Sequence, residues 1–304
     1  MNWISQMKEL KKNFSEQVLF NENLSKYSWF NLGGPAKVVF KPKNLNELSV
    51  FLKNIKNIGE IKILGAGSNT LIRDGGFNGV IIKLGKNFSH ISLFDGNKII
   101  AGSSALDKAV SNFALDNSLS GLEFLSCIPG TIGGGIRMNS GCYGEDLSKI
   151  LLSVQAMDLE GKLRVFYSTD IKFAYRDCNL EKDLIFISAT LKGKVSEKKN
   201  IQRKINDLIK KKKEDQPSKI KTCGSTFKNP PNNKAWELIK KSNCAGLKIG
   251  GAQISEMHCN FFVNNGSAKS SDLEKLINLV KSKVFNKTGI NLELEVQIIG
   301  ENIE

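Results

Sequence analysis

Glycine is concentrated in one stretch of the sequence, between Gly121 and Gly144. The stretch holds the pair Pro129-Gly130, the run Gly133-Gly134-Gly135, and Gly141. Each glycine loses more backbone entropy on folding than another residue, so a chain keeps such a cluster where the backbone takes a positive φ or approaches a ligand closely. The pattern favours a cradle of bare N–H groups for a phosphate-bearing cofactor. An elaborate turn is the alternative reading of the same residues.

A second glycine-rich loop, Gly65-Ala-Gly-Ser-Asn-Thr70, follows an apolar run. It does not fit the dinucleotide-binding fingerprint, because Thr70 stands where the third glycine is needed and no long helix pattern follows. Neither loop contains the Gly-Lys-Ser/Thr of a P-loop. The two loops therefore belong to neither of the commonest nucleotide-binding folds.

Composition indicates a globular protein of two or three domains. The chain has 304 residues, of which 40% are hydrophobic and 24% charged. Its formal net charge is +14, which suits nucleic acid or a cleft for anionic substrates. The lysines are spread along the chain, and the densest run, Lys210–Lys213, is typical of a solvated helix end.

Cysteine spacing and the N-terminus point to the cytoplasm. None of the six cysteines forms a CxxC pair and only two histidines occur, which excludes a zinc-finger pattern. No apolar run approaches the roughly 18 residues of a membrane span. Charged residues from Lys8 to Glu16 interrupt any apolar core of a signal peptide. We expect a cytoplasmic protein without a membrane anchor.

Helices and strands alternate along the first two thirds of the chain. Residues 1–28 read as an amphipathic helix and a connector, and residues 44–57 as a helix capped by Asn44. The helix predicted at 104–117 directs Leu106, Ala109, Val110 and Phe113 inward. Strands are predicted at 36–40, 79–84, 98–102, 152–158, 162–168 and 184–192, and a charged helix at 196–213.

The last third repeats this mixture. We predict a helix at 234–242, a turn at 246–251 and a strand at 259–264. A further helix begins with a capping box of Ser271 and Glu274 and ends at Gly289. In the closing strand, 292–300, alternation places Glu293 and Glu295 on one face.

Several motifs occur together in the order found in one known family. They are Leu64–Thr70, Ile128–Gly134 with Met138-Asn139 and Gly141, Tyr175-Arg176, Gly224–Pro230, Gly250–His258 and Glu293–Val296. The set resembles the UDP-N-acetylenolpyruvoylglucosamine reductases of bacterial peptidoglycan synthesis, the MurB family. The resemblance covers about residues 28–300 and is highly specific as a set, although each motif alone is weak.

The resemblance implies an α+β fold. A FAD-binding domain of the vanillyl-alcohol-oxidase (PCMH) type precedes a smaller α+β substrate-binding domain. The expected divisions are an N-terminal helix and connector at 1–27, the FAD-binding domain at 28–195 with subdomains at about 28–85 and 86–195, a linker helix at 196–218, and the substrate-binding domain at 219–304. The short connection between Arg176 and Ser225 resembles the subgroup without an extra tyrosine-bearing loop.

The resemblance also implies an activity. FAD is bound tightly but non-covalently, NADPH donates hydride, and UDP-N-acetylglucosamine enolpyruvate is reduced to UDP-N-acetylmuramate. We expect a monomer that binds neither nucleic acid nor membrane. The third glycine of the run at 133–135 is often alanine in relatives, and Asn31 and Met257 depart from the family's usual residues.

Three residues are the expected catalytic groups. Arg176 binds the substrate carboxylate, on which negative charge builds during hydride addition. Ser225 donates the proton to the α carbon, and Glu295 assists as a buried, neutral carboxyl. Glu293 is the competing candidate on the same strand face, and the family pattern favours Glu295.

The binding residues follow from the same motifs. Expected FAD contacts are Gly65, Gly67, Ser68, Asn69, Thr70, Pro129, Gly130, Thr131, Gly133, Gly134, Gly135 and Asn139. Expected substrate contacts are Tyr175, Lys228, Asn229 and Gln253, with Glu256 as a weaker one. No metal site is expected.

Two other functions fit parts of the sequence. A different flavin-dependent oxidoreductase on the same cofactor fold would lack the set Arg176, Ser225 and Glu295. A nucleic-acid-binding protein, suggested by the net charge, would need clustered arginines and interleaved aromatic residues, which the sequence lacks.

Overall fold

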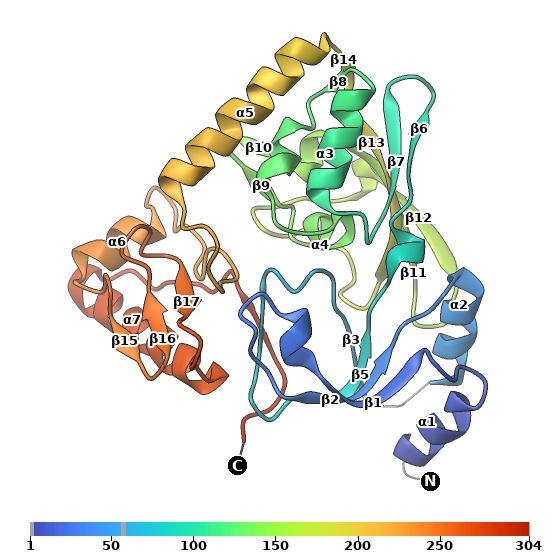
Figure 1. Ribbon diagram of the computed structural model, residues 1–304, viewed down its shortest axis with the longest axis horizontal. Helices are drawn as coiled ribbons and strands as arrows, with labels where there is room; N and C mark the ends of the chain where they lie inside the picture. The colour runs from blue at the N-terminus through green and yellow to red at the C-terminus, as the bar shows by residue number, and fades with distance from the viewer. Residues whose placement is uncertain (1–2, 56–58, 304) are drawn as a thin grey trace. The chain divides into compact units, whose positions relative to one another are not determined.

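The computed structural model describes residues 3–55 and 59–303. It mixes helices and strands throughout, which confirms the expected α+β class (Figure 1). Contacts divide the chain into two compact units. Unit 1 comprises residues 1–20, 38–66 and 79–212, and unit 2 comprises residues 21–37, 67–78 and 213–304. The domain boundaries expected from the sequence stay a prediction.

A five-stranded antiparallel sheet organises the larger part of unit 1. Its order is β12-β11-β13-β7-β6. The strands are β6 (Ile91–Phe94), β7 (Lys98–Gly102), β11 (Leu151–Met157), β12 (Leu163–Tyr167) and β13 (Ile185–Lys192). Four of them, all except β6, confirm strands predicted from alternation and apolar runs. In the register, Leu191 of β13 faces Ile99 of β7 and Leu151 of β11.

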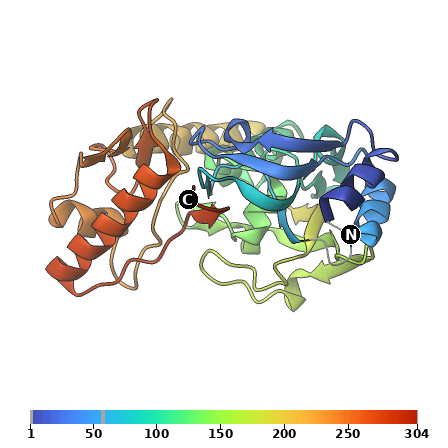
Figure 2. The same ribbon diagram turned by 90° about the horizontal axis from the view of Figure 1, so that it is seen from below.

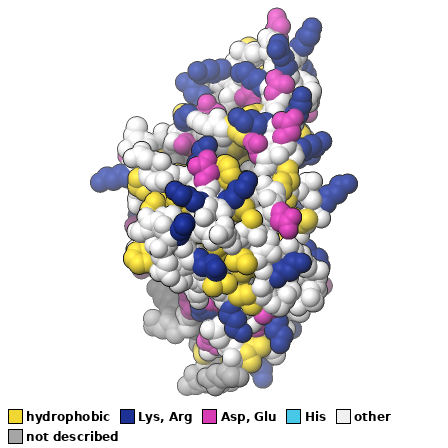
Figure 3. Space-filling view, turned by 90° about the vertical axis from the view of Figure 1, so that its left-hand side faces the viewer, with side chains coloured by type: hydrophobic (Ala, Val, Ile, Leu, Met, Phe, Trp, Pro, Cys, Tyr) yellow, Lys and Arg dark blue, Asp and Glu magenta, His cyan; other side chains and the backbone are white. Residues whose placement is uncertain are grey.

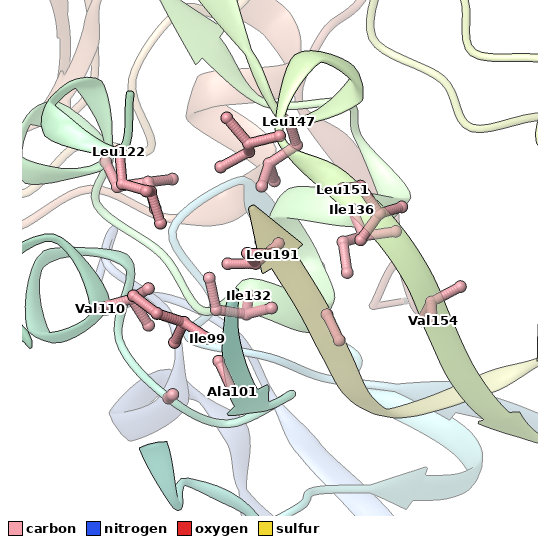
Figure 4. Packing of buried hydrophobic residues seen from close by; sticks show 14 of the residues in the cluster. Ile99, Ala101, Val110, Leu122, Ile132, Ile136, Leu147, Leu151, Val154 and Leu191 are labelled. Carbon is pink, nitrogen blue, oxygen red and sulfur yellow. The ribbon is translucent and has the colours of Figure 1, made fainter. Parts of the chain in front are cut away.

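Two helices complete the core of this part. Helix α3 (Asp107–Asp116) and the short helix α4 (Ile132–Arg137) contribute Val110, Ile132 and Ile136, which pack with Ile99 and Leu191 (Figure 4). Leu106 precedes α3 and is 56% exposed, so its predicted inward position is wrong. The helix begins three residues later than predicted, which leaves Leu106 outside its buried face.

A second core in unit 1 combines aliphatic side chains with several aromatic rings. Helices α1 (Trp3–Lys11) and α2 (Leu45–Asn54) pack with strands β3 (Glu60–Ile63) and β5 (Phe77–Ile82), which pair in parallel. The rings of Phe40 and Phe51 stack with centroids 3.6 Å apart. Asn44 caps α2 as predicted, because its side chain accepts the N–H of Glu47 at 2.8 Å. Residues 56 and 57 of the predicted helix lie outside the described residues.

The segment predicted as a helix and connector also contains a strand. Strand β1 (Val18–Asn23) joins the sheet β1-β2-β5-β3, in which β2 is Pro35–Phe40. Its apolar run is only three residues long, Val18 to Phe20, which is too short to show a period in the sequence. The remaining short elements are β8 (Leu119–Ser120), β9 (Gly141–Cys142), β10 (Glu145–Asp146), β14 (Lys194–Val195) and the 3₁₀ turns Leu24–Tyr27, Lys86–Phe88, Glu123–Cys127, Leu147–Lys149 and Ser168–Asp170.

Unit 2 packs two helices against small sheets. Helix α6 (Ala235–Lys241) and the long helix α7 (Ser270–Thr288), orange in Figure 2, share a core with β15 (Lys248–Ile249), β16 (Ala252–Ile254) and β17 (Phe262–Asn264). Strand β17 is shorter than predicted, because Cys259 and Asn260 lie in a turn. Two strand residues, Lys248 and Ile249, lie where only a turn was predicted.

Helix α5 (Lys198–Asp215) confirms the predicted charged helix.

The closing strand is also shorter than predicted. Strand β18 (Gln297–Ile299) pairs in parallel with β4 (Thr70–Ile72), the continuation of the first glycine loop. Residues 292–296 are extended without being a full strand, and only Leu294 makes an isolated bridge, to Phe227. Leu292 and Val296 are buried and Glu293 is exposed, so part of the predicted alternation is confirmed.

The start of α7 differs from the predicted capping box. The Asp74 carboxylate accepts the N–H groups of Ser270 and Ser271 at 2.8 and 2.9 Å. Burial opposes ionisation of Asp74, but these N–H bonds outweigh it and lower its pKa. Glu274 is instead held by two hydrogen bonds from Arg73, each 2.9 Å long. The distant carboxylate of Asp74 thus caps the first two residues of the helix, while the local Asp272 accepts the N–H of Lys269 at 2.9 Å.

On the face that Figure 3 shows, Lys and Arg side chains are scattered among acidic and apolar ones rather than gathered in one patch. Helix α7 does end at Gly289, whose φ is 73°. None of the helices in the described residues has the length and apolarity to cross a membrane.

One buried carboxyl in unit 1 has no partner. Asp107 is fully buried, and neither of its oxygens has a hydrogen-bond partner among the described residues. Burial raises the pKa of Asp107 to about 8. The folded protein therefore holds a proton there at neutral pH that the unfolded chain loses near pH 4.

We predict that Asp107→Asn changes how stability depends on pH. Because the folded-state pKa is raised, the wild-type protein loses stability as the pH rises from about 4 to about 8, by up to about 1.4 kcal/mol per pH unit. The variant lacks this loss. As the pH rises, its free energy of unfolding therefore increases relative to that of the wild type. Denaturant titrations across this range measure it. Asp116→Asn, exposed on the same helix, is the control, and parallel curves for Asp107→Asn and wild type would contradict the prediction.

Candidate functional site

The first glycine loop carries a run of unbonded backbone donors. No N–H group from Gly65 to Asn69 has a hydrogen-bond acceptor among the described residues. The carbonyl of Gly65 accepts from the Lys83 ammonium at 2.7 Å, and the carbonyl of Gly67 accepts from the N–H of Trp29 at 3.1 Å. The loop is therefore fixed through its carbonyls, while its N–H groups remain available to an anion.

The second glycine segment behaves in the same way. The N–H groups of Gly130, Thr131 and Gly134 have no acceptor in the described part of the chain. Those of Ile132 and Gly133 donate to the carbonyls of Ala105 and Ser103, at 3.0 and 2.9 Å. These two bonds attach the segment to the chain between β7 and α3.

The glycines of the two segments serve different purposes. A Cβ at Gly67 would lie 1.8 Å from the Tyr27 carbonyl oxygen, and one at Gly135 would lie 2.7 Å from Leu147 Cδ1. Packing within the protein therefore requires both. A Cβ at Gly134 would meet only Thr131 Oγ1, at 3.7 Å.

Gly65 resembles Gly134 in this respect. A Cβ there would also meet only Thr131 Oγ1, at 3.1 Å. Gly65, Thr131 and Gly134, all in unit 1, therefore mark a place where the protein leaves room beside bare N–H groups. This is the arrangement that a closely approaching diphosphate needs.

Asn139 supports the turn that carries Arg176. Its side-chain amide donates to the carbonyl of Ala174 at 3.2 Å and accepts the N–H of Ser148 at 3.0 Å. Ala174 and Asp177 exchange two backbone hydrogen bonds, which places Tyr175 and Arg176 at the tip of the turn. The structure thus gives Asn139 a clear structural role, and its predicted FAD contact stays a prediction.

Arg176 has an unusual backbone conformation. Its φ is 61°, in the left-handed region that side chains other than glycine and asparagine seldom adopt. Its guanidinium lies 4.9 Å from the centre of the Tyr175 ring. Such a conformation costs about 1–3 kcal/mol and persists only where the surrounding structure holds it.

Ser225 and Glu295, both in unit 2, are joined through one peptide group. The carbonyl of Thr226 accepts the N–H of Glu295 at 2.9 Å and that of Val296 at 3.3 Å. Ser225 is half-buried, and its hydroxyl makes no hydrogen bond to a described residue. The amide of Asn69 donates to the carbonyl of Glu295 at 2.9 Å. Three residues predicted to act in the site are thus brought together in this unit.

The predicted substrate residues are more dispersed. The Lys228 ammonium lies 3.6 Å from the Glu293 carboxylate. The side chain of Asn229 accepts the N–H of Ala235, at the start of α6, and that of Gln253 accepts from Asn265. Tyr175 is 51% exposed. These contacts occupy part of the hydrogen-bonding capacity of each side chain, and their binding roles stay predictions.

Two polar residues in these segments escaped the sequence analysis. Asp107 lies beside Gly135, with its Oδ1 3.5 Å from where a Cβ would stand, and Asn260 is bonded to the segment that follows Ser225. Neither sits in a motif with a recognisable spacing. Only their burial, which the sequence alone does not give, distinguishes them from surface residues.

Two family models match successive parts of the chain. The first describes a FAD binding domain and matches residues 36–167. The second describes the C-terminal domain of UDP-N-acetylenolpyruvoylglucosamine reductase and matches residues 216–299. The bare N–H groups of the glycine loop at 65–69 and of Gly130, Thr131 and Gly134 all lie within the first match.

Relatives match nearly the whole chain. The UDP-N-acetylenolpyruvoylglucosamine reductase of Pelagibacter ubique is 48% identical over 97% of this chain and 99% of its own length. That of Rickettsia akari is 45% identical over 92% of this chain and 95% of its own length.

A solved structure adds a match in three dimensions. The crystal structure of the reductase from Thermus caldophilus aligns with a TM-score of 0.81 and 30% sequence identity, covering 93% of this chain and 98% of that one. The chain therefore belongs to the UDP-N-acetylenolpyruvoylglucosamine reductase family.

Proposed function

We propose that this protein reduces UDP-N-acetylglucosamine enolpyruvate to UDP-N-acetylmuramate with FAD as the bound cofactor and NADPH as the hydride source, a step of peptidoglycan synthesis. The observation that carries the proposal is the 48% identity to a reductase of this name over 97% of the chain. We further propose that the protein works as a cytoplasmic monomer, and that its cofactor and substrate domains follow the boundaries expected from the sequence.

The residues present fit FAD. A diphosphate needs several donors and close backbone approach, and both glycine segments offer bare N–H groups. Gly65 and Gly134 leave open space where any side chain would intrude. We propose that Gly65–Thr70 and Pro129–Gly135 hold the diphosphate, with added bonds from the hydroxyls of Ser68 and Thr131.

The chemistry requires a hydride at one carbon and a proton at its neighbour. Bound FAD, reduced by NADPH, supplies the hydride. The substrate is an enol ether conjugated to a carboxylate, so hydride addition at the β carbon pushes negative charge onto that carboxylate. We propose that the Arg176 guanidinium binds and stabilises this charge. Arginine suits the role, because it stays ionised and binds a carboxylate through two parallel hydrogen bonds.

The α carbon of the substrate receives its proton from a side chain of the protein. We propose that Ser225 is the donor, since its hydroxyl is not engaged by any described residue. A hydroxyl alone is a weak acid, so it needs a positioned neighbour. We propose Glu295 for that role, as a neutral carboxyl that donates a hydrogen bond toward the developing charge. For the nucleotide part of the substrate we propose Tyr175, Lys228, Asn229 and Gln253.

We predict that Gly134→Ala weakens FAD binding without weakening the apoprotein. Alanine meets only Thr131 Oγ1, at 3.7 Å, and favours the helix by about 0.5–1 kcal/mol, so the thermal unfolding temperature of the apoprotein stays the same or rises. Its methyl group occupies the space reserved for the diphosphate. We expect FAD affinity, measured by fluorescence titration, to fall about tenfold or more, which is about 1.4 kcal/mol.

Gly85→Ala is the matched control, because nothing lies within 4 Å of the added Cβ. It should leave FAD affinity unchanged. Equal FAD affinity in the Gly134→Ala protein and the wild type would contradict the assignment of Gly134 to the cofactor.

We predict that Ser225→Ala separates the two half-reactions. The variant keeps FAD and is reduced by NADPH at the wild-type rate, because that half-reaction does not use the hydroxyl. Reoxidation by the enolpyruvyl substrate slows by about 10²–10⁴-fold, the usual contribution of a positioned acid. Stopped-flow absorbance of the flavin follows both steps. Ser267→Ala, on the surface of unit 2, is the control. Full turnover by Ser225→Ala would remove Ser225 from the mechanism.

We predict different effects for two neighbouring glutamates. Glu295→Gln slows reoxidation by about tenfold or more, because an amide is a weaker hydrogen-bond donor toward the developing charge than a neutral carboxyl. Glu293→Gln leaves the rate nearly unchanged, since the side chain is 77% exposed and contacts only the Lys228 ammonium among the described residues. Single-turnover rates measure both, and the reverse order of effects would assign the role to Glu293.

A further inference from the structure

Asn260 is a buried polar residue beside the Ser225 segment. It is 3% exposed and lies in the turn that precedes β17. Its side-chain oxygen accepts the N–H of Phe227 at 2.9 Å, and its side-chain nitrogen donates to the carbonyl of Phe227 at 2.8 Å. Its own carbonyl accepts the N–H of Thr226 at 2.8 Å. One residue therefore satisfies three backbone groups of the segment.

The side chain replaces a missing strand residue. A carboxamide has the same donor and acceptor as a peptide group, so Asn260 pairs with Phe227 as a neighbouring strand would. On the other side of the segment, Phe227 bridges Leu294, and Thr226 accepts from Glu295 and Val296. The segment 225–227 is thus held between Asn260 with Phe261 and the residues 294–296.

This arrangement links Asn260 to both proposed proton-transfer residues. Ser225 bridges Phe261, the residue next to Asn260, and Glu295 is bonded to the Thr226 carbonyl. Phe227 is fully buried, so water cannot replace the amide without a change in the segment's path. A displaced Thr226–Phe227 peptide would move Ser225 and Glu295 relative to each other.

We propose that Asn260 is a positioning residue for proton delivery, which sets the geometry of Ser225 and Glu295 through the Thr226–Phe227 peptide. The inference rests on the proposed function. Asn260 takes no part in the bond changes, in which a C–H bond forms at the α carbon and the Ser225 O–H bond breaks. It affects the protonation of the substrate and leaves the reduction of FAD by NADPH unaffected.

A matched pair of variants tests this proposal. Asn264, in β17 of the same unit, is 7% exposed, and its side chain makes three hydrogen bonds, to Phe30, Gly266 and Ala268, where the Asn260 side chain makes two. None of these partners belongs to the segment 225–227. Asn260→Ala and Asn264→Ala therefore remove equally buried amides, but only the first touches the segment that carries Ser225.

The readout is the split between half-reactions in the FAD-loaded full chain. For Asn260→Ala we expect reduction by NADPH within about twofold of wild type and reoxidation by UDP-N-acetylglucosamine enolpyruvate slower by about tenfold or more, with kcat lowered more than KM raised. Asn264→Ala should keep the reoxidation rate within about twofold of the wild-type rate. This holds even if its unfolding temperature falls as much as that of Asn260→Ala. Unchanged reoxidation in Asn260→Ala, or equal slowing in both variants, would overturn the proposal.

A second variant keeps the proposal testable if Asn260→Ala does not fold. Asn260→Asp retains both hydrogen bonds only while its carboxyl is protonated. Its reoxidation rate, relative to wild type, should recover as the pH falls, while reduction by NADPH shows no such trend. A pH-independent ratio would count against Asn260. If reduced wild-type protein is not reoxidised by the substrate at all, the proposed function fails instead.

Discussion

Backbone N–H and C=O groups that leave water need hydrogen-bond partners. The candidate site of this protein depends on which of these groups have a partner within the chain and which do not. In unit 2 the segment 225–227 has its peptide groups bonded on both sides, by Asn260 and by residues 294–296. In the two glycine segments the N–H groups from Gly65 to Asn69 and those of Gly130, Thr131 and Gly134 are left without acceptors among the described residues. Satisfied groups hold the segment that carries Ser225 in place, and unsatisfied N–H groups remain available to an anion.

Glycine serves two separate ends in this design. At Gly67 and Gly135 the protein itself fills the space that a Cβ would need. At Gly65 and Gly134 the neighbouring space is open apart from Thr131 Oγ1. A count of glycines cannot separate the two cases, because both preserve the same residue. The distances around each position can, and they distinguish the glycines that the fold requires from those that leave open space beside them.

Polar side chains repeatedly act as extensions of the backbone. Asp74 caps α7, Asn139 holds the turn of Arg176, and Asn69 and Asn260 bind the chain around Glu295 and Ser225. Each provides hydrogen bonds at a place where no strand or helix neighbour is available. A local geometry held in this way is sensitive to single substitutions, because one amide or carboxylate satisfies several backbone groups at once.

The sequence by itself determined the chemistry and most of the regular elements. Glycine loops, the Tyr175-Arg176 pair and the motif around Ser225 are local patterns, and the four strands from 98–102 to 184–192 lie where the sequence predicts them. Only the tertiary structure decided what depends on distant partners. The first two residues of α7 are capped by Asp74 rather than by the predicted capping box of Ser271 and Glu274. Leu106 is exposed, and the buried Asn260 holds the segment that follows Ser225. The physical reason is that a hydrogen bond between residues far apart in the chain leaves no periodicity in the sequence, whereas burial of a helix or strand face does.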